Sequence, residues 1–283
     1  MYEKRYDLEV TVENNNILVA KQVSVAFRIA GKLQKAIYDI DLTVKHGEVL
    51  AIVGESGSGK STFATAVMGL HNPNQTQIKG SILLDGEEVV GKTGDSMSKL
   101  RGTKVGMIFQ NPLTALNPLM KIGQQVMEML AVHEVYPESQ YESRTFQLLE
   151  QVGIPNSKRV ANQFPHQLSG GMRQRVMISI AIANDPDLII ADEPTTALDV
   201  TIQAQILDLI LDVQKKKNAG VILITHDLGV VAEVADTVAV MYAGQLVEKA
   251  SVEELFNNPK HPYTRSLLRS NPSAETVSDD LYV

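Results

Sequence analysis

A glycine-rich segment at residues 54–61, Gly-Glu-Ser-Gly-Ser-Gly-Lys-Ser, constrains the fold more than any other part of this 283-residue sequence. It directly follows an apolar run at 49–53 and precedes a segment whose composition suits a helix. A strand, a glycine-rich loop and a helix in this order are typical of the phosphate-binding P-loop. The glycines let backbone N–H groups face phosphate oxygens, and the helix adds its positive N-terminus. The sequence therefore predicts a nucleotide site in an α/β protein.

Residues of this loop have separate predicted roles. Lys60 is expected to reach the β- and γ-phosphates of ATP, and Ser61 to ligate Mg²⁺. The remaining cofactor-binding positions that we predict here are Gly54, Ser56, Gly57, Gly59 and Thr62. The alternative interpretation is an ordinary turn rich in glycine and serine, which the apolar strand in front of it disfavours.

Continuous apolar runs at 49–53, 188–191 and 221–224 are typical of parallel strands that are covered on both faces. Helical spacing after the second run places a set of apolar residues on one face: Ile202, Ile206, Leu209, Ile210 and Val213. This alternation of apolar strands and amphipathic helices predicts an α/β fold.

Two regions differ from this core. Residues 17–45 and 78–90 are predicted to be strands that pair into a meander, with Asp85-Gly86 as a hairpin turn. Residues 91–98 are predicted to be a surface loop. Residues 119–183 are predicted to be mostly helical. We thus expect a P-loop, RecA-like core with an antiparallel β subdomain and an inserted α-helical subdomain.

The predicted organisation is a single nucleotide-binding domain over residues 1–283. Its α/β core and β subdomain take residues 17–110 and 185–250, and the helical subdomain takes 119–183. Residues 251–283 form a C-terminal extension.

Composition excludes several classes of site and partner. The chain has no cysteine, so it holds no disulfide and no iron–sulfur cluster or zinc site built on cysteine. Its net charge of −7 argues against nucleic acid as a partner. The longest uninterrupted apolar run, residues 238–243, is far shorter than the roughly 20 residues that a membrane-spanning helix needs. Membrane contact is therefore expected only through partner chains.

The second apolar run ends in two carboxylates, Asp192 and Glu193. Asp192 is placed to hold the Mg²⁺ shell, as the Walker-B aspartate does in P-loop proteins. Glu193 is then a candidate to polarise the attacking water. Such pairs also occur in solvated loops, but their position after a P-loop favours the catalytic interpretation.

Residues 168–172, Leu-Ser-Gly-Gly-Met, resemble the signature motif of ABC ATPases. Ser169, Gly170 and Gly171 can begin a helix whose N–H groups bind a γ-phosphate. The resemblance covers roughly residues 17–268. It implies that Gln110 contacts Mg²⁺ and water and leads into a permease-facing segment. It also implies that residues 197–199, including Asp199, cross a dimer interface and that His226 contacts the γ-phosphate.

The family also stacks an aromatic residue on adenine. Phe27 is our candidate, with Tyr38 second, and a place in the core is the alternative for Phe27.

Residues 110–118 and 258–264 are similar to the oligopeptide/dipeptide branch of import ATPases, which also includes nickel importers. Many members of this branch continue into a tail with cysteines that hold an iron–sulfur cluster. This sequence has no cysteine, so it either lacks that element or is a shortened sequence.

The resemblance implies a motor that uses ATP and Mg²⁺ at the cytoplasmic face of the membrane. Its implied partners are a paralogous ATPase subunit in a heterodimer, two transmembrane permeases and an extracytoplasmic substrate-binding protein. In the family geometry, each subunit offers its signature motif to the ATP of the other.

Three alternatives to peptide import remain at this point. One is an importer of nickel or another small substrate. The second is a soluble ABC ATPase unrelated to transport, and the third is a module that binds ATP without hydrolysing it. The intact Glu193 and His226 disfavour the third alternative.

Overall fold

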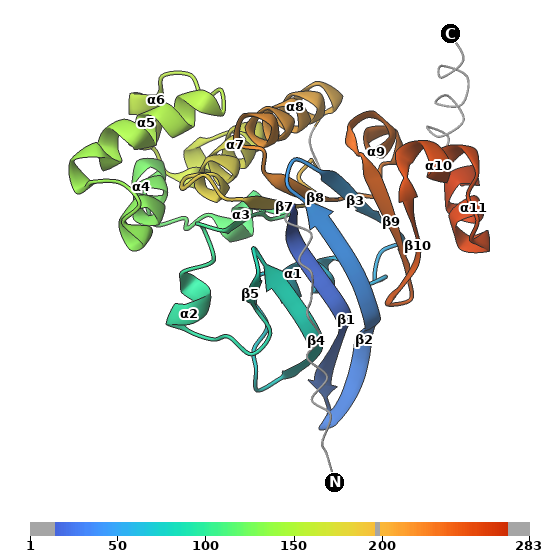
Figure 1. Cartoon of the computed structure of the whole chain (residues 1–283). Coiled ribbons are helices and arrows are strands. Elements are labelled where there is room, and N and C mark those ends of the chain that lie inside the picture. Colours follow the sequence, from blue (N-terminus) through green and yellow to red (C-terminus); the bar gives the residue numbers. More distant parts are fainter. Residues whose placement is uncertain (1–14, 196–198, 271–283) are drawn as a thin grey trace.

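The structure is a computed structural model that describes residues 15–195 and 199–270. A six-stranded sheet forms its centre, with the strand order β10-β9-β3-β8-β7-β6 (Figure 1). Its ladders are parallel except the one between β9 and β10. The strands are β3 (Val49–Val53), β6 (Val105–Ile108), β7 (Leu188–Asp192), β8 (Gly220–Ile224), β9 (Thr237–Tyr242) and β10 (Gln245–Ser251).

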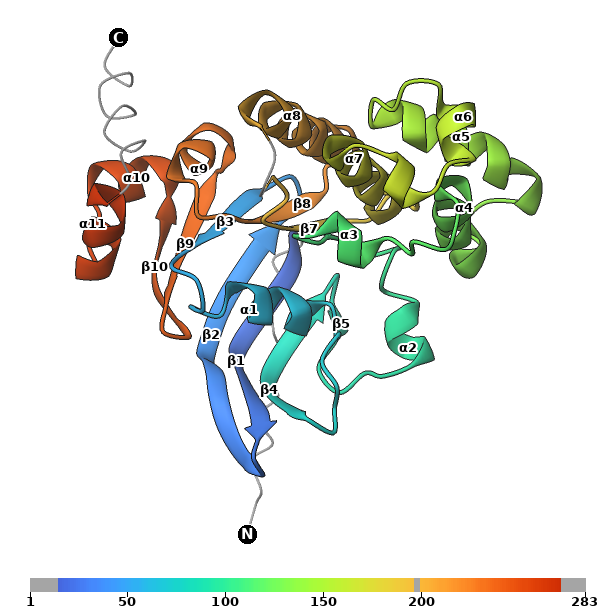
Figure 2. The ribbon, with the colours of Figure 1, turned by 180° about the vertical axis from the view of Figure 1, so that it is seen from behind.

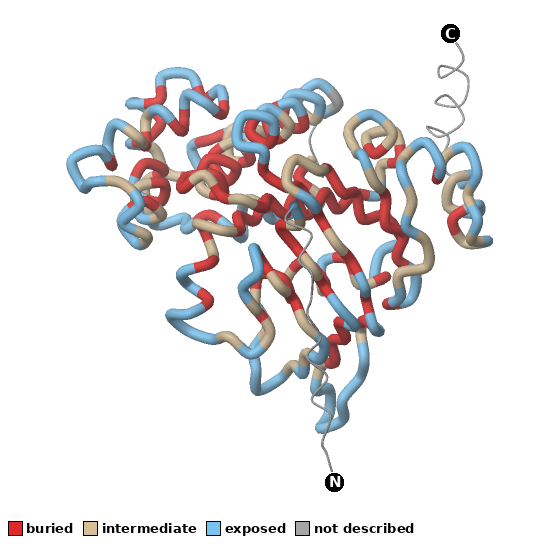
Figure 3. Tube along the Cα trace, in the orientation of Figure 1, coloured by how far each residue is buried: buried red, intermediate tan, exposed pale blue. Residues whose placement is uncertain are grey.

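Both faces of this sheet are covered, as the continuous apolar runs predicted. In β7, Leu188 and Ile190 belong to one hydrophobic cluster, whereas Ile189 and Ala191 belong to the cluster on the opposite face. All four side chains are buried. The central strands are accordingly the most continuously buried part of the chain (Figure 3).

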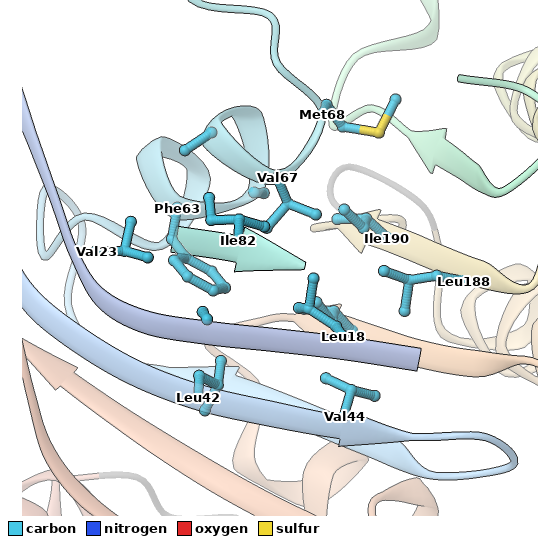
Figure 4. Packing of buried hydrophobic residues seen from close by; sticks show 14 of the residues in the cluster. Leu18, Val23, Leu42, Val44, Phe63, Val67, Met68, Ile82, Leu188 and Ile190 are labelled. Atoms are coloured by element: carbon cyan, nitrogen blue, oxygen red, sulfur yellow. The ribbon is translucent and has the colours of Figure 1, made fainter. Parts of the chain in front are cut away.

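A four-stranded antiparallel sheet packs on one side, in the order β2-β1-β4-β5. Helix α1 (Lys60–Val67) lies between the two sheets (Figure 2). Phe63 and Val67 of this helix lie among Ile82 of β4 and Ile190 of β7 (Figure 4). The strands are β1 (Asn16–Ile29), β2 (Lys32–Lys45), β4 (Thr76–Leu84) and β5 (Glu87–Glu88).

The opposite face carries α7 (Gly170–Ala181), α8 (Val200–Lys217) and α9 (Leu228–Val234) (Figure 1). The predicted apolar face of α8 is confirmed, because Ile206, Ile210 and Val213 are buried there. Helices α4 (Ile122–His133), α5 (Tyr141–Gln151) and α6 (Ser157–Ala161) gather at one end of the molecule. Helices α10 (Val252–Asn257) and α11 (Pro262–Arg269) lie at the other end. Shorter elements include α3 (Pro112–Ala115) and 3₁₀ turns at Glu138–Gln140 and Pro165–Gln167.

The predicted α/β fold class with an antiparallel sheet and added helices is confirmed. Two details of the sequence prediction were wrong. The antiparallel strands do not form a meander, because β4 pairs with the free edge of β1 after the chain has passed through β3 and α1. The predicted surface loop at 91–98 contains a short helix, α2 (Asp95–Ser98), because Met97 is fully buried in the core.

The predicted hairpin turn is present. Asp85 and Gly86 both have positive φ, 48° and 77°, as a two-residue hairpin turn that follows the strand twist requires. Of the helices in the described part of the chain, none combines the length and the apolar character of a membrane span.

Candidate functional site

The glycine-rich loop joins the end of β3 to the start of α1 and wraps tightly against neighbouring backbone. Gly54 and Gly59 have φ of 145° and 104°, values that residues other than glycine rarely adopt. A Cβ at Gly54 would overlap the carbonyl oxygen of Met241, and one at Gly59 would lie 2.6 Å from Cγ2 of Ile37. These glycines are therefore required both by conformation and by space.

Lys60 is nearly buried, with 6% of its surface exposed, at the first position of α1. Its ammonium group donates to the backbone carbonyls of Gly54 and Glu55, each at 2.8 Å. Burial lowers the pKa of Lys60, whereas the carboxylates of Glu193 and Asp192 act against this shift. The loop's own carbonyls thus hold this nearly buried cation inside the loop.

Ser61 follows Lys60 and faces the end of β7. Its hydroxyl donates to Oδ1 of Asp192 at 3.1 Å. Burial raises the pKa of Asp192 above its ordinary value, although the hydrogen bond from Ser61 acts against this shift. The pair offers one hydroxyl oxygen and one carboxylate oxygen, the hard donors that Mg²⁺ prefers beside substrate phosphates. This donor set fits the Mg²⁺ ion that a P-loop site uses.

Glu193 brings three strand ends together. Its Oε2 accepts a hydrogen bond of 2.8 Å from Nε2 of Gln110, which follows β6. Its Oε1 lies 3.7 Å from Nδ1 of His226, which follows β8. The backbone of Glu193 has a φ of 47°, and its N–H donates to the carbonyl of Ile224 at 2.9 Å. Such left-handed residues persist only where surrounding contacts hold them.

Two cavities of about 440 Å³ and 420 Å³ flank the loop. Both are lined by Ser56, Lys60, Gln110 and Glu193, so they border the same groups from two sides. The first is also lined by further predicted residues, Gly57, Gly59, Ser61 and Thr62. The second is also lined by Gly54 and His226.

Of the two aromatic residues predicted to stack on adenine, Tyr38 lies beside the P-loop and Phe27 lies against the hydrophobic core. Tyr38 lines the first cavity beside the loop. Phe27 packs against the core and makes an edge-on contact with His71, with ring centroids 5.4 Å apart. His71 in turn lies 3.2 Å from the carbonyl of Thr62 on α1. The stacking role of Phe27 stays a prediction.

The signature residues begin α7 on the surface. The hydroxyl of Ser169 caps the helix by accepting from the N–H of Met172 at 3.3 Å. A Cβ at Gly170 would meet nothing within 4 Å, whereas one at Gly171 would lie 3.1 Å from Ile202. These described residues line neither cavity beside Lys60.

Asp199 is exposed and caps α8 by accepting from the N–H of Ile202 at 3.0 Å. The rest of the predicted interface-crossing segment, Ala197 and Leu198, lies outside the described residues. The structure therefore places Asp199 at a helix start near the signature helix, since Ile202 also neighbours Gly171.

Sequence reasoning missed a buried link between the signature helix and the carboxylates. Gln174, one turn into α7 and 2% exposed, donates from Nε2 to the carbonyl of Pro194 at 2.6 Å. Pro194 directly follows Glu193. The position of Gln174 just after the signature motif can be read from the sequence. Its hydrogen-bond partner cannot, because that partner depends on tertiary packing.

The fold and this site define a P-loop nucleotide-binding and nucleotide-hydrolysing protein. Comparison with family models matches residues 37–196 to the ABC transporter model and 247–282 to the C-terminal region of oligopeptide/dipeptide transporters. The oligopeptide transport ATP-binding protein OppD of Lactococcus lactis subsp. lactis is 90% identical over 96% of this chain and 80% of its own length.

The dipeptide transport ATP-binding protein DppD of Lactococcus lactis subsp. cremoris is 46% identical over 94% of this chain and 76% of its own length. The dimeric ATP-binding cassette MJ0796 in a post-hydrolysis state with ADP and phosphate superposes with a TM-score of 0.73. The two chains are 28% identical, and the match covers 83% of this chain and 98% of the MJ0796 chain. The chain belongs to the ABC transporter family as an ATP-binding, ATP-hydrolysing subunit.

We expect Gln174→Leu to lower the free energy of unfolding by about 1–3 kcal/mol, because it leaves the buried carbonyl of Pro194 without its donor. Urea unfolding followed by circular dichroism measures this change. Gln151→Leu, at an exposed position on α5, is the matched control and should shift it by less than about 0.5 kcal/mol. Equal shifts in the two variants would contradict a structural role for this contact.

Proposed function

We propose that this chain is the motor subunit of a membrane importer for oligopeptides or dipeptides. One observation carries the proposal: the chain matches both the ABC transporter model and the C-terminal region of oligopeptide/dipeptide transporters. The names of the two curated relatives described above support the same substrate class.

In this proposal the P-loop holds the phosphates of ATP. Lys60 contacts the β- and γ-phosphates as a point charge, and N–H groups of residues 54–62 surround them. Ser61 and Asp192, with Gln110, would hold Mg²⁺, which would neutralise charge that develops on the phosphates. The buried position of Lys60 supports this role, because an ammonium group interacts more strongly with phosphate where water is excluded.

Glu193 then orients and polarises the attacking water. Its carboxylate accepts from Gln110 and lies beside His226, so two neighbouring side chains restrict its direction. In our proposal Gln110 also contacts the water, and His226 contacts the γ-phosphate. Catalysis here depends on position and charge rather than on a covalent intermediate.

A second subunit completes each site. Ser169, Gly170 and Gly171 lie outside the cavities beside their own Lys60, and Gly170 faces open space. We infer that they bind the γ-phosphate held by a paralogous ATPase subunit, and that Asp199 lies at the interface. ATP binding thereby closes the dimer, and hydrolysis opens it.

The segment after Gln110 is the proposed contact with two transmembrane permeases. Leu113 and Leu119 expose 59% and 86% of their surfaces there, and apolar groups so exposed suit burial against a partner. An extracytoplasmic substrate-binding protein delivers cargo to the same complex. The chain is then peripheral to the membrane at its cytoplasmic face and contacts it through the permeases.

We expect Glu193→Gln to reduce steady-state ATP turnover of the assembled complex by at least about 100-fold, because the amide cannot accept the water's proton. Binding of ATP, measured by equilibrium titration, should change little. Glu142→Gln, an exposed carboxyl on α5, is the control and should retain wild-type turnover. Turnover of Glu193→Gln within a few-fold of wild type would remove Glu193 from this role.

The substrate class is tested by transport. Proteoliposomes that contain this chain, its paralogue and the two permeases, supplied with the substrate-binding protein, should accumulate labelled oligopeptide or dipeptide only when ATP reaches the ATPase side. The Glu193→Gln complex should not accumulate it. ATP-dependent uptake of Ni²⁺ in place of peptide would contradict peptide import and leave the ATPase assignment intact.

A further inference from the structure

The peptide unit between Gly54 and Glu55 is held from both ends. Its carbonyl oxygen, that of Gly54, accepts from the ammonium of Lys60 at 2.8 Å. Its N–H, that of Glu55, donates to the hydroxyl of Tyr263 at 3.0 Å, although Tyr263 is 208 residues away in sequence. A trans peptide is planar, so its C=O and N–H point in opposite directions. Fixing the N–H therefore fixes the direction of the carbonyl that binds Lys60.

This peptide needs an external constraint. Gly54, with φ of 145°, has a backbone conformation that other residues rarely adopt, and without a Cβ it can also adopt other conformations at little cost. Lys60 is nearly buried, so its ammonium depends on well-placed carbonyls in place of water. A rotated peptide 54–55 would remove one of the two carbonyls that lie 2.8 Å from this ammonium.

Tyr263 is itself firmly placed. It lies in the first turn of α11, where its N–H donates to Nδ1 of His261 at 3.2 Å, and the following residue, Thr264, is fully buried. Its ring lies against Tyr242, with centroids 4.3 Å apart. Burial raises the pKa of the Tyr263 hydroxyl. Leu267, one turn later, lines the cavity that Lys60 also lines.

We propose that Tyr263 is a positioning residue of the ATPase site. Its hydroxyl orients the Gly54–Glu55 peptide, and this peptide places the Lys60 ammonium for the β- and γ-phosphates. Helix α11, within the region that matches oligopeptide/dipeptide transporters, thus acts on the P-loop of its own chain. The inference rests on the proposed contact of Lys60 with those phosphates.

The test compares two fluorescent nucleotides on the purified full chain, trinitrophenyl-ATP and trinitrophenyl-AMP. Tyr263→Phe removes only the hydroxyl and keeps the ring. We expect it to weaken binding of trinitrophenyl-ATP about three- to tenfold, within the limit set by the net contribution of the one hydrogen bond that it removes. Binding of trinitrophenyl-AMP should not change, because AMP has no β- or γ-phosphate for Lys60 to contact.

Tyr242→Phe is the matched control, since it makes the same change on the adjoining ring without touching the bond to Glu55. It should leave both affinities unchanged. Equal weakening for both nucleotides in Tyr263→Phe, or no weakening for either, would overturn the positioning role. If the wild-type chain bound the two nucleotides equally, the assignment of Lys60 would fail first, and this inference with it.

Discussion

The nearly buried ammonium group of Lys60 is the constraint around which the site is built. A cation removed from water is costly unless oxygen atoms replace its hydration. The carbonyls of Gly54 and Glu55 supply them here, and the carboxylates of Asp192 and Glu193 stabilise the charged form. The loop can present those carbonyls only because Gly54 accepts a backbone conformation closed to other residues. The conformation of the loop and the charge of the site are therefore both linked to Lys60.

The parallel sheet explains why residues far apart in sequence surround this cation. β3, β6, β7 and β8 run in the same direction, so their carboxyl ends lie at one edge. The P-loop, Gln110, the Asp192–Glu193 pair and His226 each lie at or just after the carboxyl end of one of these strands. Helix α7 then joins this edge to the signature residues through the contact of Gln174 with Pro194.

Local sequence patterns predicted the elements that depend on local chemistry. The apolar run before Gly54 indicated a covered strand, and Asp85-Gly86 indicated a tight hairpin turn. Motif spacing also placed the candidate residues at strand ends. What the sequence could not predict depends on long-range packing. The burial of Met97 turns an apparent loop into a helix, and the hydroxyl of Tyr263 reaches Glu55 only because α11 packs beside the P-loop.

The central claim is that one chain supplies only half of each ATP site. It is tested most directly by mixing two variants, Lys60→Ala and Ser169→Arg, at concentrations where wild-type turnover rises faster than linearly with chain concentration. Each variant alone should be inactive. In a mixed pair, the intact P-loop of one chain meets the intact signature residues of the other, so turnover should return. A mixture no more active than the separate variants would contradict the account.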